Sequence, residues 1–260
     1  MLMDFQIICG IMMPFFGTVL GALAVFCMKG LNMRLFATLS GFAGGVMMAA
    51  SFFSLILPAI DGAAYLGALS FVPAVVGFAL GVAVLLLFDK LIPHLHLDGR
   101  REGPLTMTSS AGMLVLAVTM HNFPEGVAVG VLYAAVLSGE AGASLAAATV
   151  LALGVSVQNF PEGAIISMPL AARGVKKSRA FALGVLSAAV ELVGALFALL
   201  LSSLFLPLLP YLLGFAAGAM IYVVVEELIP EIALDKESNV GTLAFAIGFA
   251  VMMVLDVALG

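Results

Sequence analysis

Long apolar stretches follow one another along almost the whole chain, interrupted only by short polar segments. Each stretch reaches roughly the 18 to 20 residues that an α-helix needs to cross the hydrocarbon core of a bilayer. Hydrophobic residues make up 63% of the sequence and charged residues only 10%, whereas roughly 25% of the residues in an average soluble domain are charged. Because this chain has too little polar surface to fold in water, we predict an all-α integral membrane protein.

The polar segments divide the chain into eight predicted spans. Their expected bounds are 5–28, 35–59, 68–89, 106–136, 144–170, 179–206, 209–229 and 240–259. The division between the sixth and seventh spans rests on Pro207 and Pro210. One long broken helix with a re-entrant piece is the alternative there, but about 50 residues of helix would be roughly 75 Å long. No segment reads as a separate soluble domain, so we expect residues 1–260 to form one transmembrane domain.

All ten Lys and Arg residues lie in the first, third, fifth and seventh of the polar segments between these spans. With eight spans, those segments share one face of the membrane, and the positive-inside rule makes that face cytoplasmic. Both termini are then expected outside. The predicted location is the cell membrane, which the chain crosses several times. The chain has no basic stripe that would indicate a nucleic-acid partner, so the lipid bilayer is the expected surrounding.

Acidic side chains lie inside these apolar stretches, where no Lys or Arg neutralises them. An ionisable group at the bilayer centre costs at least ~2.5–3.5 kcal/mol on insertion scales, and it is tolerated where it meets a partner, an ion or water. A bound divalent cation balances two carboxylates well. The acidic residues therefore point to a cation pathway.

The same six-residue motif occurs in the fourth and fifth predicted spans, as His-Asn-Phe-Pro-Glu-Gly at 121–126 and Gln-Asn-Phe-Pro-Glu-Gly at 158–163. Consecutive spans run antiparallel, so the two copies should face each other about an inverted pseudo-two-fold axis in the membrane plane. Paired, interrupted segments of this kind are the best sequence indication of a transport site.

The spacing within the motif places its polar side chains together. Positions i and i+4 share a helix face, which pairs His121 with Glu125 and Gln158 with Glu162. The prolines of the motif lack an N–H, so we expect local kinks and freed carbonyl oxygens at membrane depth. An imidazole, an amide oxygen and two carboxylates suit zinc and other first-row divalent metals better than calcium or magnesium.

Several further acidic residues have two readings. Glu191 in the sixth span is a metal or pathway residue, or a structural hydrogen-bonding group. Glu226, Glu227 and Glu231 near the cytoplasmic end of the seventh span form an exit site, or they are solvated end charges. Asp256 near the outer end of the last span receives the ion, or it is solvated.

Three other candidates are also open. Met47 in the second span is a core residue by base rate. His94 and His96 lie beside Asp98 in the third polar segment, where they bind metal transiently or form plain loop. The small-residue stretch 41–45 permits close helix packing within a protomer or between two protomers, so a homodimer is one arrangement that the sequence allows.

On the two motifs, and along the whole chain, the sequence resembles the ZIP family (Zrt-, Irt-like proteins) of divalent metal transporters, and it is most similar to its compact bacterial branch. The resemblance implies that zinc, or Cd²⁺, Fe²⁺ or Mn²⁺, is a transported substrate rather than a prosthetic group. It also implies movement of the ion into the cytoplasm by an elevator-like motion of the central helices.

The resemblance further implies a role for each motif residue. One metal position would be lined by His121, Glu125, Gln158, Glu162 and Met47. A second, adjacent position would be formed by Asn122, Asn159 and Glu191, and it would share Glu125 and Glu162 with the first. The exit route would pass Glu226 and Glu227. The chain departs from the family at Asn159, where some bacterial members have Asp, and at Glu226, where His is common. Its histidine-bearing segment is also short, which argues against a metal-sensing role there.

Two other functions compete with metal transport. An intramembrane zinc-dependent hydrolase would also place His and carboxylates at membrane depth, but the HExxH motif is absent and a catalytic zinc usually needs three protein ligands. A non-metal proton-coupled carrier would also need buried acids. We therefore expect a transporter and not an enzyme.

Overall fold

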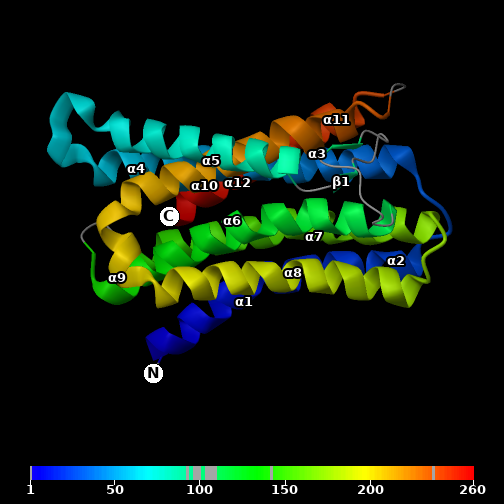
Figure 1. Cartoon of the computed structure of the whole chain (residues 1–260), viewed down its shortest axis with the longest axis horizontal. Helices are drawn as coiled ribbons and strands as arrows, with labels where there is room; N and C mark the ends of the chain where they lie inside the picture. The colour runs from blue at the N-terminus through cyan, green and yellow to red at the C-terminus, as the bar shows by residue number, and fades with distance from the viewer. Residues whose placement is uncertain (1, 92–93, 96–100, 103–109, 141–142, 236–237) are drawn as a thin grey trace.

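The computed structural model describes residues 2–91, 94–95, 101–102, 110–140, 143–235 and 238–260, of which 2, 94–95, 101–102, 110–118, 120 and 121 are described in their backbone only. Long helices run side by side along the longest axis of the molecule (Figure 1). Large apolar side chains cover their outer faces; Leu200 is 73% exposed and Val257 is 74% exposed. An apolar surface that extends over so many helices is unfavourable in water but favourable in contact with lipid.

The elements in the first half of the chain are α1 (Leu2–Ala22), α2 (Ala24–Cys27), α3 (Met33–Ala50), η1 (Ser51–Ile56), α4 (Leu57–Gly62), η2 (Ala64–Leu69), α5 (Phe71–Leu91), β1 (His94–Leu95), β2 (Arg101–Glu102) and α6 (Ser110–Ser138). The second half forms α7 (Leu145–Ala172), α8 (Lys177–Leu200), α9 (Ser202–Phe205), η3 (Leu206–Leu208), α10 (Leu209–Val223), η4 (Val224–Leu228), α11 (Ile229–Ile232) and α12 (Val240–Leu259).

Six helical stretches within the described part of the chain are long and apolar enough to cross a membrane. They are Met3–Cys27, Met33–Gly62, Phe71–Leu91, Lys177–Leu200, Ser202–Ile232 and Val240–Leu259. The remaining long helices, α6 and α7, contain the two polar motifs. The chain is therefore a multi-pass helical membrane protein.

One bound of the predicted elements is wrong. The sixth predicted span ends at Leu200 rather than at residue 206, because Leu201 leaves the helical conformation with φ −100° and ψ 17°. The third polar segment also contains a small antiparallel hairpin, which the sequence did not predict, in which His94 lies opposite Glu102 and Leu95 opposite Arg101. The hairpin lies in a polar segment outside the predicted spans. Backbone groups there can bond to water, so the segment does not need to be helical as a segment in lipid does.

The helices pack most closely in four pairs: α1 with α7, α6 with α8, α3 with α12, and α5 with α10. Glycines make these approaches possible. A Cβ on Gly163 would lie 2.0 Å from the backbone oxygen of Thr18, and one on Gly126 would lie 2.0 Å from that of Glu191. The pairs assemble into two groups, one of α1, α6, α7 and α8 and the other of α3, α5, α10 and α12 (Figure 1).

Two π-helical segments interrupt the long helices of the second group. Segment η1 lies just before Pro58, and η4 lies just before Pro230. A proline within a helix removes one backbone hydrogen bond and its ring collides with the carbonyl four residues earlier, and a wider π turn accommodates that carbonyl. In contrast, α6 continues past Pro124 and α7 continues past Pro161.

Candidate metal site

The two motif copies meet between α6 and α7. The Nε2 atom of Gln158 donates a hydrogen bond of 2.7 Å to Oε1 of Glu125. Gln158 is 0% exposed and Glu125 is 1% exposed. The prediction that the copies face each other is therefore confirmed for this pair of side chains.

The motif asparagines extend the cluster to two further helices. Asn122 donates from Nδ2 to the backbone oxygen and to Oγ of Ser187 on α8, both at 3.2 Å. Asn159 donates from Nδ2 to Oε2 of Glu191 on α8 at 2.8 Å, and to the backbone oxygen of Pro14 on α1 at 3.3 Å. The nitrogen of each amide is thus occupied by protein acceptors, which fixes the direction of its oxygen.

Four buried oxygen atoms of this cluster receive no hydrogen bond from the residues that the structure describes: Asn122 Oδ1, Glu125 Oε2, Gln158 Oε1 and Asn159 Oδ1. Buried polar atoms in folded proteins nearly always have a partner. An acceptor left unsatisfied in an apolar interior costs about 1–3 kcal/mol. Oxygen atoms without donors are what a cation binds, so this set fits a positively charged ligand.

The charges of the cluster point in the same direction. Glu162 is buried on α7, and its carboxylate repels those of both Glu125 and Glu191. Like charges this close in a low-dielectric interior favour either protonation or a bound cation. A divalent ion would turn the mutual repulsion of these carboxylates into a shared attraction.

Two predicted members of the site are placed only in part. Helix α6 carries His121, but the side chain of His121 lies outside the described residues, so its imidazole ligand stays a prediction. Met47 on α3 is buried in the main apolar cluster, and its metal contact likewise stays a prediction. Among the described residues, no three His, Cys, Asp or Glu side chains come together as a metal site by themselves. The buried amide oxygens of the motifs are therefore candidate ligands as well.

A cavity of about 370 Å³ lies between this cluster's helices and the ends of α4, α10 and α12. Its lining includes Ser54, Asp61 and Asp256, and Ser54 Oγ donates to Asp256 Oδ1 at 2.8 Å. The sequence allowed two readings of Asp256, either a solvated side chain or a residue at which the ion enters. In the structure Asp256 is part-buried and lines this cavity.

The acidic residues of the seventh predicted span lie at the opposite end of the molecule from this cavity. Glu226 and Glu227 belong to η4, and Glu231 on α11 accepts a 2.6 Å hydrogen bond from Ser40. The structure describes only the backbone of His94, in strand β1, and His96 lies outside the described residues.

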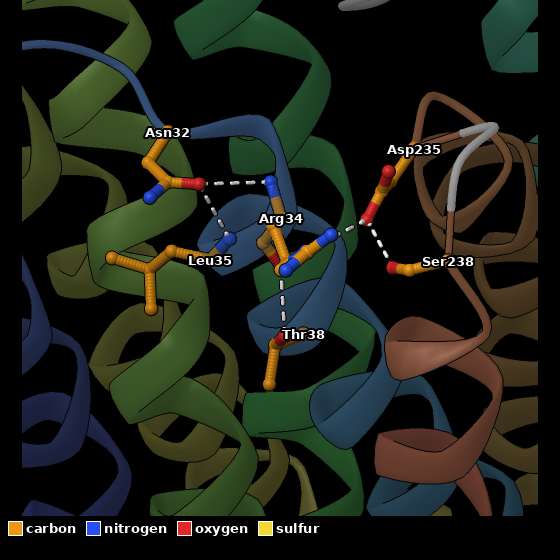
Figure 2. Close-up of polar contacts among 6 residues, drawn as sticks. All are labelled: Asn32, Arg34, Leu35, Thr38, Asp235 and Ser238. Atoms are coloured by element: carbon orange, nitrogen blue, oxygen red, sulfur yellow. Dashed lines mark hydrogen bonds and ion pairs between the residues drawn. The ribbon is translucent and has the colours of Figure 1, made fainter.

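Figure 2 shows the same end of the molecule, where the start of α3 meets the segment after α11. Asn32 Oδ1 caps α3 by accepting from the backbone N–H groups of Arg34 and Leu35. The Arg34 side chain reaches Asp235 at 3.9 Å, and Ser238 donates to the same carboxylate at 2.5 Å. This ion pair joins two segments of the same group of helices, and because Arg34 is exposed it contributes little to stability.

Sequence reasoning missed the residues that hold the site from outside the motifs. Thr18 on α1 donates to Glu191 Oε1 at 3.1 Å, and Ser187 on α8 accepts from Asn122. A hydroxyl in an apolar helix has no distinctive pattern around it. Asp89 near the end of α5 is also buried, at 2% exposed, and accepts a hydrogen bond from Tyr222.

A multi-pass helical bundle with a buried cluster of carboxylate and amide side chains defines a helical membrane protein with a polar interior. The sequence profile described as ZIP Zinc transporter matches residues 97–256, and the chain belongs to the ZIP family.

Relatives match over nearly the whole chain. Zinc transporter ZIP11 of Homo sapiens is 35% identical, over 98% of this chain and 98% of its own length. Zinc transporter GufA of Myxococcus xanthus is 39% identical over 94% of each chain, and Zinc transporter ZIPB of Bordetella bronchiseptica is 36% identical over 95% of this chain and 79% of its own. Each of these relatives is named as a transporter and not as an enzyme.

Proposed function

We propose that this protein carries a divalent metal ion, zinc by preference, across the membrane into the cytoplasm through the cluster between α6 and α7. The observation that carries the proposal is the set of four buried oxygens without donors, all contributed by the duplicated motif. Glu125, Glu162, Gln158 and His121 are the proposed ligands, with Met47 beside them. The names of the ZIP relatives support zinc as the substrate, and Cd²⁺, Fe²⁺ and Mn²⁺ have similar ligand preferences.

The proposed topology has eight spans with both termini outside. Helices α6 and α7 would be the fourth and fifth spans, in addition to the six stretches that are apolar enough on their own. Figure 1 supports this arrangement, because both chain ends lie toward the end of the molecule opposite the link between α2 and α3, which carries Lys29. The bacterial inner or plasma membrane is the proposed location.

An inverted pseudo-two-fold relation between the two halves is part of the proposal. The packing supports it: α1 lies on α7 as α8 lies on α6, and α3 lies on α12 as α10 lies on α5. The sequence of α3 at 41–47, Gly-Phe-Ala-Gly-Gly-Val-Met, also returns in α10 at 214–220 as Gly-Phe-Ala-Ala-Gly-Ala-Met. Helices α5 and α12 likewise repeat a Phe-Ala-x-Gly start and an Asp end, at 78–89 and 245–256.

The proposed route begins at the cavity lined by Asp256, passes the motif cluster and leaves beside Glu226, Glu227 and Glu231. The acid-lined cavity would concentrate cations at the outer mouth. The division of the helices into two groups supports an elevator-like motion, in which the group holding the site moves against the group of α3, α5, α10 and α12.

Zinc uptake into proteoliposomes containing the purified protein tests the proposal. We expect saturable uptake by the wild type, and loss of at least about 90% of it in Glu125→Ala and Glu162→Ala, because each change removes a charge-bearing ligand. Glu140→Ala is the matched control, since Glu140 is exposed beyond the end of α6. Normal uptake by either site variant would contradict the proposal. Absence of uptake by the correctly inserted wild type would favour the hydrolase or the non-metal carrier.

A further inference from the structure

Glu191 differs from Glu125 in the hydrogen bonds that its carboxylate accepts. Both of its carboxylate oxygens accept hydrogen bonds, Oε1 from Thr18 at 3.1 Å and Oε2 from Asn159 at 2.8 Å. Glu125, by contrast, has one oxygen that receives no donor from the described residues. Glu191 is 2% exposed, so no solvent competes for these bonds. Protein donors therefore orient both oxygens of Glu191.

The amide of Asn159 is locked in the corresponding direction. Its Nδ2 donates to Glu191 Oε2 and also to the backbone oxygen of Pro14. A flipped amide would place its oxygen against these two acceptors, where no hydrogen bond could form. The oxygen of Asn159 therefore faces away from Glu191, and it is one of the four buried acceptors without a donor.

The contact between Asn159 and Glu191 is too short to hold an ion. Zinc–oxygen bonds are about 2.0–2.2 Å long, so two ligand atoms of one tetrahedral zinc ion lie about 3.4 Å apart. The Asn159 and Glu191 atoms are 2.8 Å apart, and the amide nitrogen is a donor with no capacity to bind metal. The place where a second ion would sit between these side chains is filled by a hydrogen bond.

From these contacts we propose that Glu191 is a positioning residue rather than a metal ligand, and that this site holds one metal ion. Thr18 fixes Glu191, Glu191 fixes Asn159, and Asn159 presents its oxygen to the cluster. The carboxylates of the two proposed ligands, Glu125 and Glu162, together carry the charge that balances one divalent ion. This inference rests on the function proposed above and adds the number of ions and the role of Glu191 and Thr18.

The first test counts Cd²⁺ ions bound to the purified full-length protein at equilibrium. The double variant Glu125→Ala/Glu162→Ala measures the number of Cd²⁺ ions bound outside the site. We expect each wild-type molecule to bind one Cd²⁺ ion more than each molecule of the double variant. We expect the variant Asn159→Asp to bind one Cd²⁺ ion more than the wild type. The substitution removes the amide donor and places a second carboxylate beside that of Glu191, so that an ion can bind between them. A difference of two ions between wild type and double variant would overturn the inference alone. Equal counts would overturn the proposed function as well.

The second test separates positioning from direct binding by conservative substitution. In Glu191→Gln, the new amide can accept from Asn159 and donate to the Thr18 hydroxyl, so we expect the Cd²⁺ affinity to stay within about threefold of the wild type. Glu191→Ala frees Asn159 and should weaken binding about 10- to 100-fold, as losses of outer-shell partners do. Thr18→Val should weaken it in the same direction, and Thr18→Ser should restore it. Equal losses in Glu191→Gln and Glu191→Ala would identify Glu191 as a ligand and overturn the inference.

Discussion

At the scale of single residues, the hydrogen bonds of the amide side chains determine how the cluster is arranged. An amide has a nitrogen that donates and an oxygen that accepts, and three amides in this cluster donate from their nitrogen to protein atoms. The oxygen of each of these amides receives no hydrogen bond from the described residues. A cation would bind such oxygens without requiring any of the amides to turn, so the proposed site is preorganised for a cation.

The amide of Gln158 can be tested directly. Gln158→Leu removes an oxygen proposed as a ligand and also the donor that orients Glu125, so we expect zinc affinity to fall at least about 10-fold. The measurement is the KM of zinc uptake in proteoliposomes, with folding checked by circular dichroism. Gln6→Leu is the matched control, because Gln6 is exposed near the start of α1 and should leave the KM unchanged. An unaltered KM in Gln158→Leu would remove this residue from the ligand set.

Asp256 tests the outer part of the route. Its carboxylate lines the outer cavity and would attract cations there. We expect Asp256→Asn to raise the KM for zinc several-fold at low ionic strength, with little change in the maximal rate, and we expect the difference to shrink as salt is added. Asp256→Glu keeps the charge and should behave like the wild type. If neutralisation leaves the KM unchanged at low salt, the ion reaches the site by another path.

At this scale the sequence predicted that the two motif copies face each other, because they lie in consecutive antiparallel spans. It predicted neither the specific hydrogen bond between Gln158 and Glu125 nor the residues that support the motifs. Thr18 could not be found in the same way, because its role depends on which face of α1 packs against α8, and an almost uniformly apolar helix does not encode that choice as a pattern. Glu191 was recognisable as unusual, but only its two hydrogen bonds indicate what it does.

At the scale of helices, the decisive contacts are the close pairs. Helix α7 lies against α1 at Gly163, where a Cβ would stand 2.0 Å from a backbone oxygen. Such an approach brings Pro14 and Thr18 within reach of the site. In a bilayer, close backbone packing of this kind replaces the hydrophobic effect as a source of helix association.

Gly163→Ala tests that packing. Within an isolated helix the change would stabilise by about 1 kcal/mol, but the added methyl group would force α1 and α7 apart. We expect the thermal stability in detergent to fall by several degrees and zinc uptake to decline. Gly30→Ala is the control, because a Cβ there meets nothing within 4 Å. A variant that is as stable and as active as the wild type would mean that the two helices tolerate a wider separation.

The π-helical segments show what element prediction leaves out. Pro58 and Pro230 were visible in the sequence, and a proline normally suggests a helix end or a kink. Here the helix continues in each case, because lipid leaves no water to satisfy an open turn and a π segment keeps the backbone bonded. The sequence does not say which of these outcomes a given proline will produce.

At the scale of the whole molecule, the distribution of Lys and Arg was the most informative property of the sequence. It predicted eight spans and their orientation together, because with that division all the basic residues lie on one face, and both stay predictions. The repeat between 41–47 and 214–220 was also present in the sequence, and it could have indicated the relation between the two halves before the packing did.

The orientation can be measured by cysteine labelling. In a background with Cys9 and Cys27 replaced by Ala, we expect Ser203→Cys to react in intact cells with a membrane-impermeant maleimide, because it lies between the sixth and seventh proposed spans. Lys176→Cys, between the fifth and sixth, should react only after the cells are opened. Both positions are exposed in the structure. Labelling of Lys176→Cys in intact cells would reverse the proposed topology.

The central claim is that a metal ion binds among the oxygens that the two motif copies leave without donors. The most direct measurement is the anomalous scattering of Cd²⁺ in crystals of the full-length protein. The account predicts a peak between α6 and α7 within about 2.5 Å of oxygen atoms of Glu125 and Gln158, a distance chosen to allow for an ion somewhat larger than zinc. Cd²⁺ peaks elsewhere in the molecule, with none at this cluster in crystals soaked well above the measured Kd, would contradict it.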